Sequence, residues 1–204
     1  GLVEVIVVSR RVQTLLFTDI VGSTDRLREL GDAAWAALRV RFHGVMRAVL
    51  AAHGGREVDT AGDGFLARFD APASAVGAAA VVVAAVAPLG IEIRAGLHTS
   101  EVELDGEEMT GVGVHLAARV MAEAGPGQVL VSATVRELMA GRGLGFVDLG
   151  ERELKGFAER WRLFALDPAT VLGDGDEGAN PVLWEPTAEV EGRGGTGVRF
   201  PGLL

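Results

Sequence analysis

Cysteine is absent from this sequence of 204 residues. Its absence excludes a disulfide framework, and it also excludes a metal site built from thiolates. A reducing compartment is the simplest setting for a chain without cysteine, so we expect a cytoplasmic location.

Positive charge is also scarce in this chain. Its 19 lysine and arginine residues are outnumbered by 28 aspartate and glutamate residues, which gives a net charge of −9. A chain of this charge offers no basic stripe to a phosphate backbone, so we expect no binding to nucleic acid. Any site for a phosphate group must therefore be built locally.

Apolar runs with the layout of a membrane signal are missing as well. The run from Leu2 to Val8 contains Glu4 and has no basic region before it, unlike a signal peptide. The run from Ala78 to Val86 is too short to span a bilayer, which takes roughly 20 apolar residues. We expect a buried helix there, and no insertion into a membrane.

Hydrophobic residues make up 49% of the chain, which is enough to bury the core of one domain. We place an N-terminal extension over residues 1–9 and the domain over residues 10–167. From 168 to 204, glycine, proline and acidic residues dominate without periodicity, so we interpret this stretch as a flexible tail or a docking segment.

The hydrophobic periodicity predicts an alternation of strands and helices. Its first strand ends at Asp19, and Ser23 or Thr24 is expected to cap the helix that follows. The predicted elements are strands over 12–18, 57–60, 65–69, 91–98, 128–132, near 146 and over 161–165, and helices over 33–52, 72–88, 111–123 and up to 140. The order β-α-β-β-α-β at the start predicts an α+β fold with a ferredoxin-like core, in which helices cover one face of an antiparallel sheet.

The strongest local signal for chemistry is a pair of carboxylates. Asp19 ends a buried strand, and Asp63 lies in a Gly-Asp-Gly turn between two later strands that could bring the two together. Hard cations such as Mg²⁺ prefer oxygen ligands, and a helix N-terminus with free N–H groups suits phosphate. We expect that phosphate site in the loop made by Val21, Gly22, Ser23 and Thr24.

Either carboxylate alone has an ordinary structural explanation, as turn chemistry or as the neighbour of a helix cap. The wider pattern is more specific. Six blocks occur in order between Arg11 and Leu166: FTDIVGST, VDTAGDGFLARF, IRAGLHTS, GVGVHLAARV, GPGQVLVS, and ELKG before WRLFAL. In order and approximate spacing these blocks resemble the class III adenylate and guanylate cyclases, especially a subclass common in actinobacteria.

The resemblance implies a metal site and a dimer. Asp19, Asp63 and the backbone carbonyl of Ile20 match the positions that hold two Mg²⁺ or Mn²⁺ ions per active site in this family. It also implies a head-to-tail homodimer, in which each cleft takes its metal ligands from one subunit and its base-recognition residues from the other. A nucleoside triphosphate, most simply ATP, is the implied substrate.

The resemblance also assigns three cationic residues. Arg94 matches the arginine that binds the triphosphate, Lys155 the lysine that reaches the β- and γ-phosphates, and Arg119 the arginine that stabilises charge in the transition state. Taken singly, Arg94 could lie on the solvent face of a strand and Lys155 could be a surface charge. Arg119 sits in an apolar helix, where an unpaired cation is costly, so its position asks for an anion. His98 is expected to be a packing residue at a strand end.

Three positions depart from the pattern of an ordinary adenylate cyclase. Asp59 stands where the family has a lysine that recognises adenine, and Glu108 replaces its aspartate partner. His115 replaces the asparagine that orients the ribose, although a histidine could still offer a hydrogen bond there. A carboxylate at Asp59 could accept from guanine N1–H, but Glu108 would then face guanine O6 with the wrong polarity.

We therefore expect a nucleotidyl cyclase, and in the first place an adenylate cyclase of low rate that forms 3′,5′-cyclic AMP and pyrophosphate. The alternatives are a guanylate cyclase or one of relaxed specificity, and a degenerate cyclase fold that binds nucleotide and regulates without turnover. The same core also serves polymerases and diguanylate cyclases, but the chain has neither a GGDEF-type signature nor a basic track for a template.

Overall fold

The structure, a computed structural model, describes residues 9–60, 62–105 and 108–172. The predicted N-terminal extension lies outside the described residues except for Ser9, and so does the predicted tail beyond residue 172. The boundaries at 10 and 167 stay predictions.

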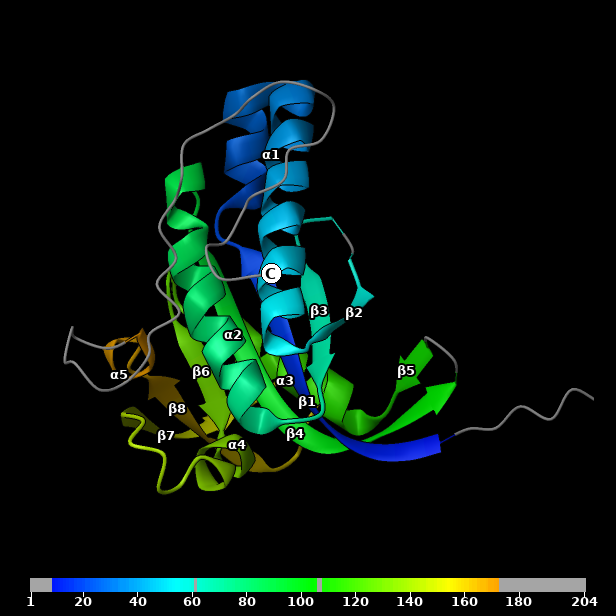
Figure 1. Ribbon diagram of the computed structural model, residues 1–204, viewed down its shortest axis with the longest axis vertical. Helices are drawn as coiled ribbons and strands as arrows, with labels where there is room; N and C mark the ends of the chain where they lie inside the picture. The colour runs from blue at the N-terminus through cyan, green and yellow to red at the C-terminus, as the bar shows by residue number, and fades with distance from the viewer. Residues whose placement is uncertain (1–8, 61, 106–107, 173–204) are drawn as a thin grey trace, which may run out of the picture.

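One eight-stranded sheet forms the centre of the molecule (Figure 1). Its strands are β1 (Ser9–Ile20), β2 (Arg56–Asp59), β3 (Phe65–Phe69), β4 (Ile93–Asp105), β5 (Glu108–Thr110), β6 (Val129–Ser132), β7 (Phe146–Glu153) and β8 (Arg160–Leu166). The helices are α1 (Ser23–His53), α2 (Pro72–Ala85), the 3-10 helix η1 (Ala87–Leu89), α3 (Val112–Ala122), α4 (Ala133–Leu138) and α5 (Ala169–Leu172).

The strand order confirms the α+β fold with a ferredoxin-like core. Neighbouring strands run β2-β3-β1-β4-β6-β8-β7, and β5 pairs with β4. The first four strands thus lie in the order β2-β3-β1-β4, all antiparallel, as a β-α-β-β-α-β unit requires. The later strands β6, β7 and β8 extend the sheet beyond β4.

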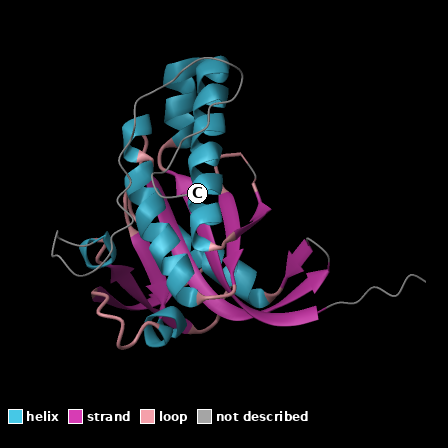
Figure 2. Cartoon of the chain, in the orientation of Figure 1, coloured by secondary structure: helices cyan, strands magenta, loops and turns pink. Residues whose placement is uncertain are grey.

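Helices cover both faces of the sheet (Figure 2). Successive strand residues point to opposite faces, so Leu16 packs with α1 and α2 whereas Leu15 packs with Ala117 of α3. The prediction that helices cover one face holds for α1 and α2. Helix α3 follows this unit in the chain and lies on the other face, and we call that side the α3 face.

Helix α2 is apolar along most of its length, and all its residues except Ala84 are buried or half-buried. Together with η1 it is long and apolar enough to cross a membrane, judged by length and composition alone. In the fold it packs against α1 and against β1, β3 and β4. Its buried residues are Ala75, Val76, Ala78, Ala79, Ala80, Val82 and Ala85. A helix between a sheet and another helix has this composition for packing reasons.

The start of α1 differs from the prediction. Its N-cap is Gly22, in a left-handed conformation with φ 67°, and no side chain caps the helix. The prediction that Ser23 or Thr24 would cap it is wrong, because the helix already begins at Ser23. Gly31, at φ 76° and ψ 165°, interrupts the helix before the segment that the periodicity predicted. The helix ends as predicted, at Gly54 in a left-handed conformation.

Strand β4 is longer than the sequence indicated. It runs seven residues past His98, to Asp105, because its second half pairs with the first residues of β1. In that half Val102 and Leu104 are buried while Glu101 is exposed, which is the alternation of a strand with one covered face. His98 therefore lies within the strand and not at its end.

Candidate active site

The two predicted metal aspartates lie at the same end of the sheet. Asp19 is the penultimate residue of β1, and Asp63 lies in the turn between β2 and β3. The antiparallel β1–β3 ladder ends at the pair Thr18 and Phe65, so the turn that holds Asp63 lies at the end of β1 that carries Asp19. Both carboxylates are partly exposed, so they are open to a ligand from solvent.

Arg94 contacts the first of these carboxylates directly. It is the β4 residue paired with Asp19, and its Nη2 and Nε atoms lie 2.8 and 3.3 Å from Asp19 Oδ2. The side chains are 33% and 23% exposed, so water weakens this ion pair and its net stabilisation is small. The structure thus places Arg94, predicted to bind a triphosphate, on a predicted metal ligand.

The donor atoms suit a hard divalent cation. Asp19, Asp63 and the backbone of Ile20 offer oxygen atoms at one sheet end, and Arg94 shows that positive charge is already drawn to Asp19. Among residues 9–60, 62–105 and 108–172, no group of three or more acidic or histidine side chains could hold a metal. Two carboxylates and a carbonyl would leave the remaining positions to water and phosphate, which is how Mg²⁺ is usually bound.

The predicted phosphate loop has fewer free backbone N–H groups than expected. The Val21 N–H donates to the Glu92 carbonyl at 2.9 Å, so it is not available to a phosphate. The Gly22 carbonyl accepts from Arg26 N–H, which starts the helical ladder. No side chain caps this end, so the N–H groups of the first turn, from Ser23 onward, remain open to an anion.

Helix α3 organises the rest of the site. It lies so close to β4 that a side chain added at Gly96 would collide with backbone atoms of Met121. Its buried residues face the sheet, while His115 is exposed and Arg119 is half-buried. Since residues four apart share a helix face, His115 and Arg119 lie on the same side of α3, away from the sheet. Its last turn reaches Arg94, whose Nη1 lies 3.5 Å from the Ala122 carbonyl.

An apolar cluster on one flank of α3 brings Lys155 to this helix. Leu154 packs in it with Leu116 and Val120, which are the α3 neighbours of His115 and Arg119. Lys155 follows Leu154 at once and is exposed. The three predicted groups that would meet ribose and phosphate therefore gather around α3.

A second cluster lies on the other flank of α3. Val58 of β2, Met109 of β5 and Val114 of α3 all pack in it. Asp59 and Glu108 are the chain neighbours of Val58 and Met109, and both carboxylates are exposed. Asp59 and Glu108, which depart from the base-recognition pattern of the family, thus lie at the border of the same apolar cluster.

Most of the predicted site residues take no part in the described ion pairs. They join Arg10, Arg28, Arg47, Arg94, Arg160 and Arg162 to carboxylates. Within the part of the chain that the structure describes, neither Arg119 nor Lys155 has a carboxylate partner. The expectation that Arg119 meets an anion stays a prediction.

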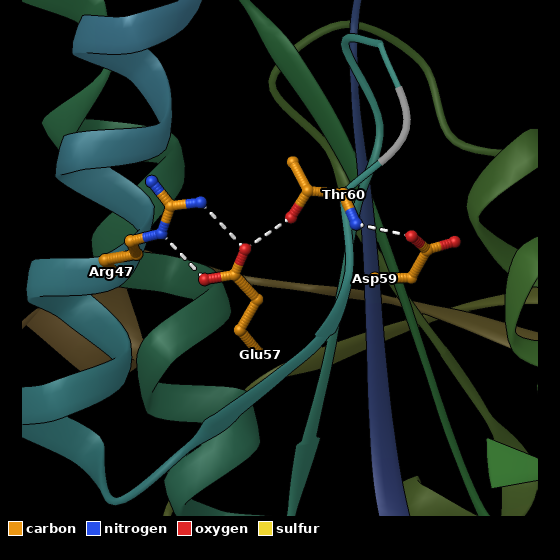
Figure 3. A network of polar contacts seen from close by, with 4 residues as sticks. All are labelled: Arg47, Glu57, Asp59 and Thr60. Atoms are coloured by element: carbon orange, nitrogen blue, oxygen red, sulfur yellow. Dashed lines mark hydrogen bonds and ion pairs between the residues drawn. The ribbon is translucent and has the colours of Figure 1, made fainter. Parts of the chain in front are cut away.

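A network behind Asp59 was not found from the sequence (Figure 3). Arg47 of α1 donates from Nε and Nη2 to the two carboxylate oxygens of Glu57, at 2.7 and 2.8 Å. Thr60 donates its hydroxyl to Glu57 at 2.6 Å and its backbone N–H to Asp59 at 2.8 Å. Helical spacing alone does not show which strand α1 covers, so the sequence carried no signal for this contact.

Comparison with known proteins identifies the family of this chain. The profile of the family described as "Adenylate and Guanylate cyclase catalytic domain" matches residues 8–167. An uncharacterized protein of Rhizobium meliloti (strain 1021) is 35% identical over 171 residues, which are 73% of this chain and 16% of that protein. A second protein of that strain, "Putative adenylate cyclase 3", is 28% identical over 170 residues, which are 79% of this chain and 29% of that protein. This chain therefore spans less than a third of the length of either relative.

A solved structure shares the fold. The adenylyl cyclase CyaB from P. aeruginosa superposes with a TM-score of 0.74 at 21% identity, over 78% of this chain and 95% of that chain. At this identity the likeness concerns the fold alone.

Proposed function

We propose, from the premise that this chain belongs to the adenylate and guanylate cyclase catalytic domain family, that it converts ATP into 3′,5′-cyclic AMP and pyrophosphate. The observation that carries the proposal is the pair Asp19 and Asp63 at one end of the sheet, next to an arginine and close to the end of α3. This arrangement offers oxygen ligands for cations beside cationic groups for phosphate.

The reaction asks the protein mainly for placement and for charge. The ribose 3′-oxygen attacks the α-phosphorus in line, and the bond to pyrophosphate breaks. Divalent cations held by Asp19, Ile20 and Asp63 would neutralise phosphate oxygens and favour ionisation of the 3′-hydroxyl. No nucleophilic side chain is needed.

The remaining residues would bind and orient the substrate. The N–H groups of Ser23 and Thr24 can receive phosphate oxygens. Arg94 neutralises Asp19 in the absence of a cation, and a cation at Asp19 would free its guanidinium for the triphosphate beside it. Lys155 and Arg119 would bind phosphate oxygens, and His115 would offer a hydrogen bond to the ribose.

Two copies of the chain would share each cleft. His115, Glu108 and Lys155 are exposed around α3, so they are placed to meet a substrate held by a second subunit. We propose a head-to-tail homodimer with two equivalent clefts, Mg²⁺ or Mn²⁺ as cofactor, and a cytoplasmic setting.

GTP is the second candidate substrate, because Asp59 lies on the α3 face where family members place a lysine. A carboxylate cannot donate to adenine N1, but it can accept from guanine N1–H and from the exocyclic amine. Glu108 favours adenine instead, since it can accept from the adenine amino group. The two carboxylates therefore pull the base preference in opposite directions.

Product formation with single triphosphates tests the proposal. Purified protein is incubated with Mn²⁺ and ATP, GTP, CTP or UTP in turn, and cyclic nucleotide is separated by chromatography. We expect cyclic AMP, and a loss of about 100-fold or more in Asp19→Asn and in Asp63→Asn, the scale on which charge stabilisation at a reacting centre acts. Asp32→Asn, which neutralises an exposed carboxylate on α1, is the matched control and should keep the wild-type rate.

The outcome also separates the alternatives. Cyclic GMP as the main product would favour the guanylate function. Retention of Mn²⁺–nucleotide without any cyclic product, abolished when both aspartates are replaced, would indicate a regulatory nucleotide-binding domain. Product that survives both substitutions would contradict the metal site.

A further inference from the structure

Strand β2 carries an irregularity between Glu57 and Asp59. Glu57 pairs with Ala67 and Asp59 pairs with Leu66, so Val58 is an extra residue without a partner in β3. Such an extra residue is a β-bulge, which reverses the alternation of side chains after it.

The bulge decides to which face Asp59 points. Ala67 packs in the core cluster of α1 and α2, whereas Leu66 packs in the cluster beneath α3. Side chains of directly paired residues share a face, so Glu57 lies on the side of α1 and Asp59 lies on the α3 face. In a regular strand the two carboxylates, two residues apart, would share the side of α1.

The contacts of Glu57 hold this irregular segment from the side of α1 (Figure 3). Strand β2 lies at the edge of the sheet, so β3 is the one strand paired with it among the described residues. Arg47 provides a second anchor through two hydrogen bonds to Glu57, and it is fixed by the buried residues Met46 and Val49 beside it on α1. The hydrogen bond from Arg47 lowers the pKa of Glu57 to about 2, so Glu57 is ionised at neutral pH.

Thr60 links this anchor to Asp59. Its hydroxyl donates to the carboxylate of Glu57, and its backbone N–H donates to the carboxylate of Asp59. The three residues Arg47, Glu57 and Thr60, which we call the β2 clamp, thus fix the chain on both sides of the bulge.

We propose that the β2 clamp sets the base preference of the enzyme by holding Asp59 on the α3 face, which makes Glu57 and Thr60 positioning residues. This inference rests on the proposed cyclase function. Without the clamp, the bulge can slip by one residue, and a one-residue slip moves a side chain to the opposite face. Strand β3 would keep its register with β1, because that pairing does not involve β2.

The expected signature is a change that depends on the base. ATP and GTP share the triphosphate and the ribose, so a residue that acts through Asp59 alters their ratio of kcat/KM. Loss of overall stability would lower the active fraction equally for both nucleotides. Inhibition by tripolyphosphate, which has no base, should not respond to the clamp.

The test compares Thr60→Val, which removes the hydroxyl and keeps the shape, with Thr60→Ser, which keeps the hydroxyl. In Thr60→Val and Glu57→Gln we expect the ATP:GTP ratio of kcat/KM to change by about three- to tenfold, mostly through KM, as the loss of one hydrogen bond implies. Thr60→Ser should restore a ratio within about twofold of the wild type. Asp148→Asn breaks an exposed pair with Arg162, remote from β2, and should also keep the wild-type ratio.

Two results would overturn the inference. One is an unchanged ratio in Thr60→Val and Glu57→Gln; the other is an equal loss for both nucleotides with a lowered thermal midpoint, which indicates a structural role only. If the wild type forms no cyclic product, the proposed function fails by itself. The ratio of ATP and GTP dissociation constants in Mn²⁺ then tests the clamp in the same variants, and a wild type that binds neither nucleotide overturns it.

Discussion

At the scale of single residues, the least solvated titratable group described is His98. It is 5% exposed beneath α3, its Nδ1 lies 2.8 Å from Ser132 Oγ, and its ring meets Trp161 edge-on at 6.0 Å. Burial lowers the pKa of His98 from 6.5 to about 4, because the charged ring would lose its hydration. The ring is therefore neutral at pH 7, and it acts as a packing residue that needs its one hydrogen bond.

The lowered pKa of His98 predicts a loss of stability in acid. Between pH 6.5 and about 4 the unfolded chain binds a proton at His98 and the folded chain does not, so protonation favours unfolding. We expect this residue to lower the free energy of unfolding by about 3 kcal/mol over that range, with no effect above pH 6.5. Denaturant titrations at pH 4, 5, 6, 7 and 8 measure it.

His98→Asn is the matched variant for this prediction. Asparagine can keep the hydrogen bond to Ser132, but it does not titrate in this range. The variant should therefore lose less stability than the wild type as the pH falls from 6.5 to 4. Equal slopes in the two proteins would show that the acid sensitivity comes from other groups.

At the scale of elements, the contact between α3 and β4 depends on one missing side chain. A Cβ at Gly96 would collide with the backbone N and Cα of Met121, and neither element can yield locally because both are part of the core. We expect Gly96→Ala to lower the free energy of unfolding by about 3 kcal/mol, at the upper end for overpacking. Cyclase activity should fall further than the folded fraction, because α3 also carries His115 and Arg119.

Gly44→Ala is the control for this substitution. Gly44 lies inside α1, and nothing is within 4 Å of a Cβ placed there. Alanine should stabilise the helix by about 0.5–1 kcal/mol, since it loses less backbone freedom on folding than glycine does. Thermal unfolding and activity per folded molecule are measured for both variants. If Gly96→Ala is no less stable than Gly44→Ala, the close approach of α3 to Gly96 does not limit the packing.

The sequence predicted the order of the elements but not all of their spatial relations. Alternation of apolar residues identified the strands around Asp19 and Asp63, and their antiparallel pairing followed from that order. The face of the sheet that α3 covers depends on contacts between distant segments, and no local pattern encodes it. The bulge at Val58 was hidden for the same reason, because its register is set by β3 and by Arg47 of α1.

The candidate site divides in the same way. The positions of the carboxylates at the sheet end followed from strands and turns, which are local features. The ion pair of Arg94 with Asp19 depends on the β1–β4 register, and the loss of the Val21 N–H to Glu92 depends on the strand that lies beside it. Both are long-range pairings that residue spacing alone does not fix.

At the scale of the whole molecule, the cationic groups at α3 bear on how two copies of the chain would form a dimer. Exposed His115 and half-buried Arg119 lie on α3, and exposed Lys155 follows Leu154, which packs against this helix; the described ion pairs include none of the three. A head-to-tail dimer would set these groups of one copy opposite Asp19 and Asp63 of the other, so each cleft would need both chains. A chain defective in one half of the cleft could then be rescued by a chain defective in the other half.

Mixing two inactive variants tests this sharing of clefts. Asp19→Ala removes a proposed metal ligand and Arg119→Ala removes a cation, so each homodimer should be inactive. Random exchange of subunits makes half of the dimers mixed, and each mixed dimer has one intact cleft, so about one quarter of the wild-type activity should return. Activity should also fall on dilution as dimers dissociate.

Asp19→Ala mixed with Asp63→Ala is the control, because both substitutions damage the metal half and every cleft keeps a defect. Recovery in both mixtures, or in neither, would contradict clefts built from two chains, whereas recovery in the first alone requires metal ligands and Arg119 to come from different subunits.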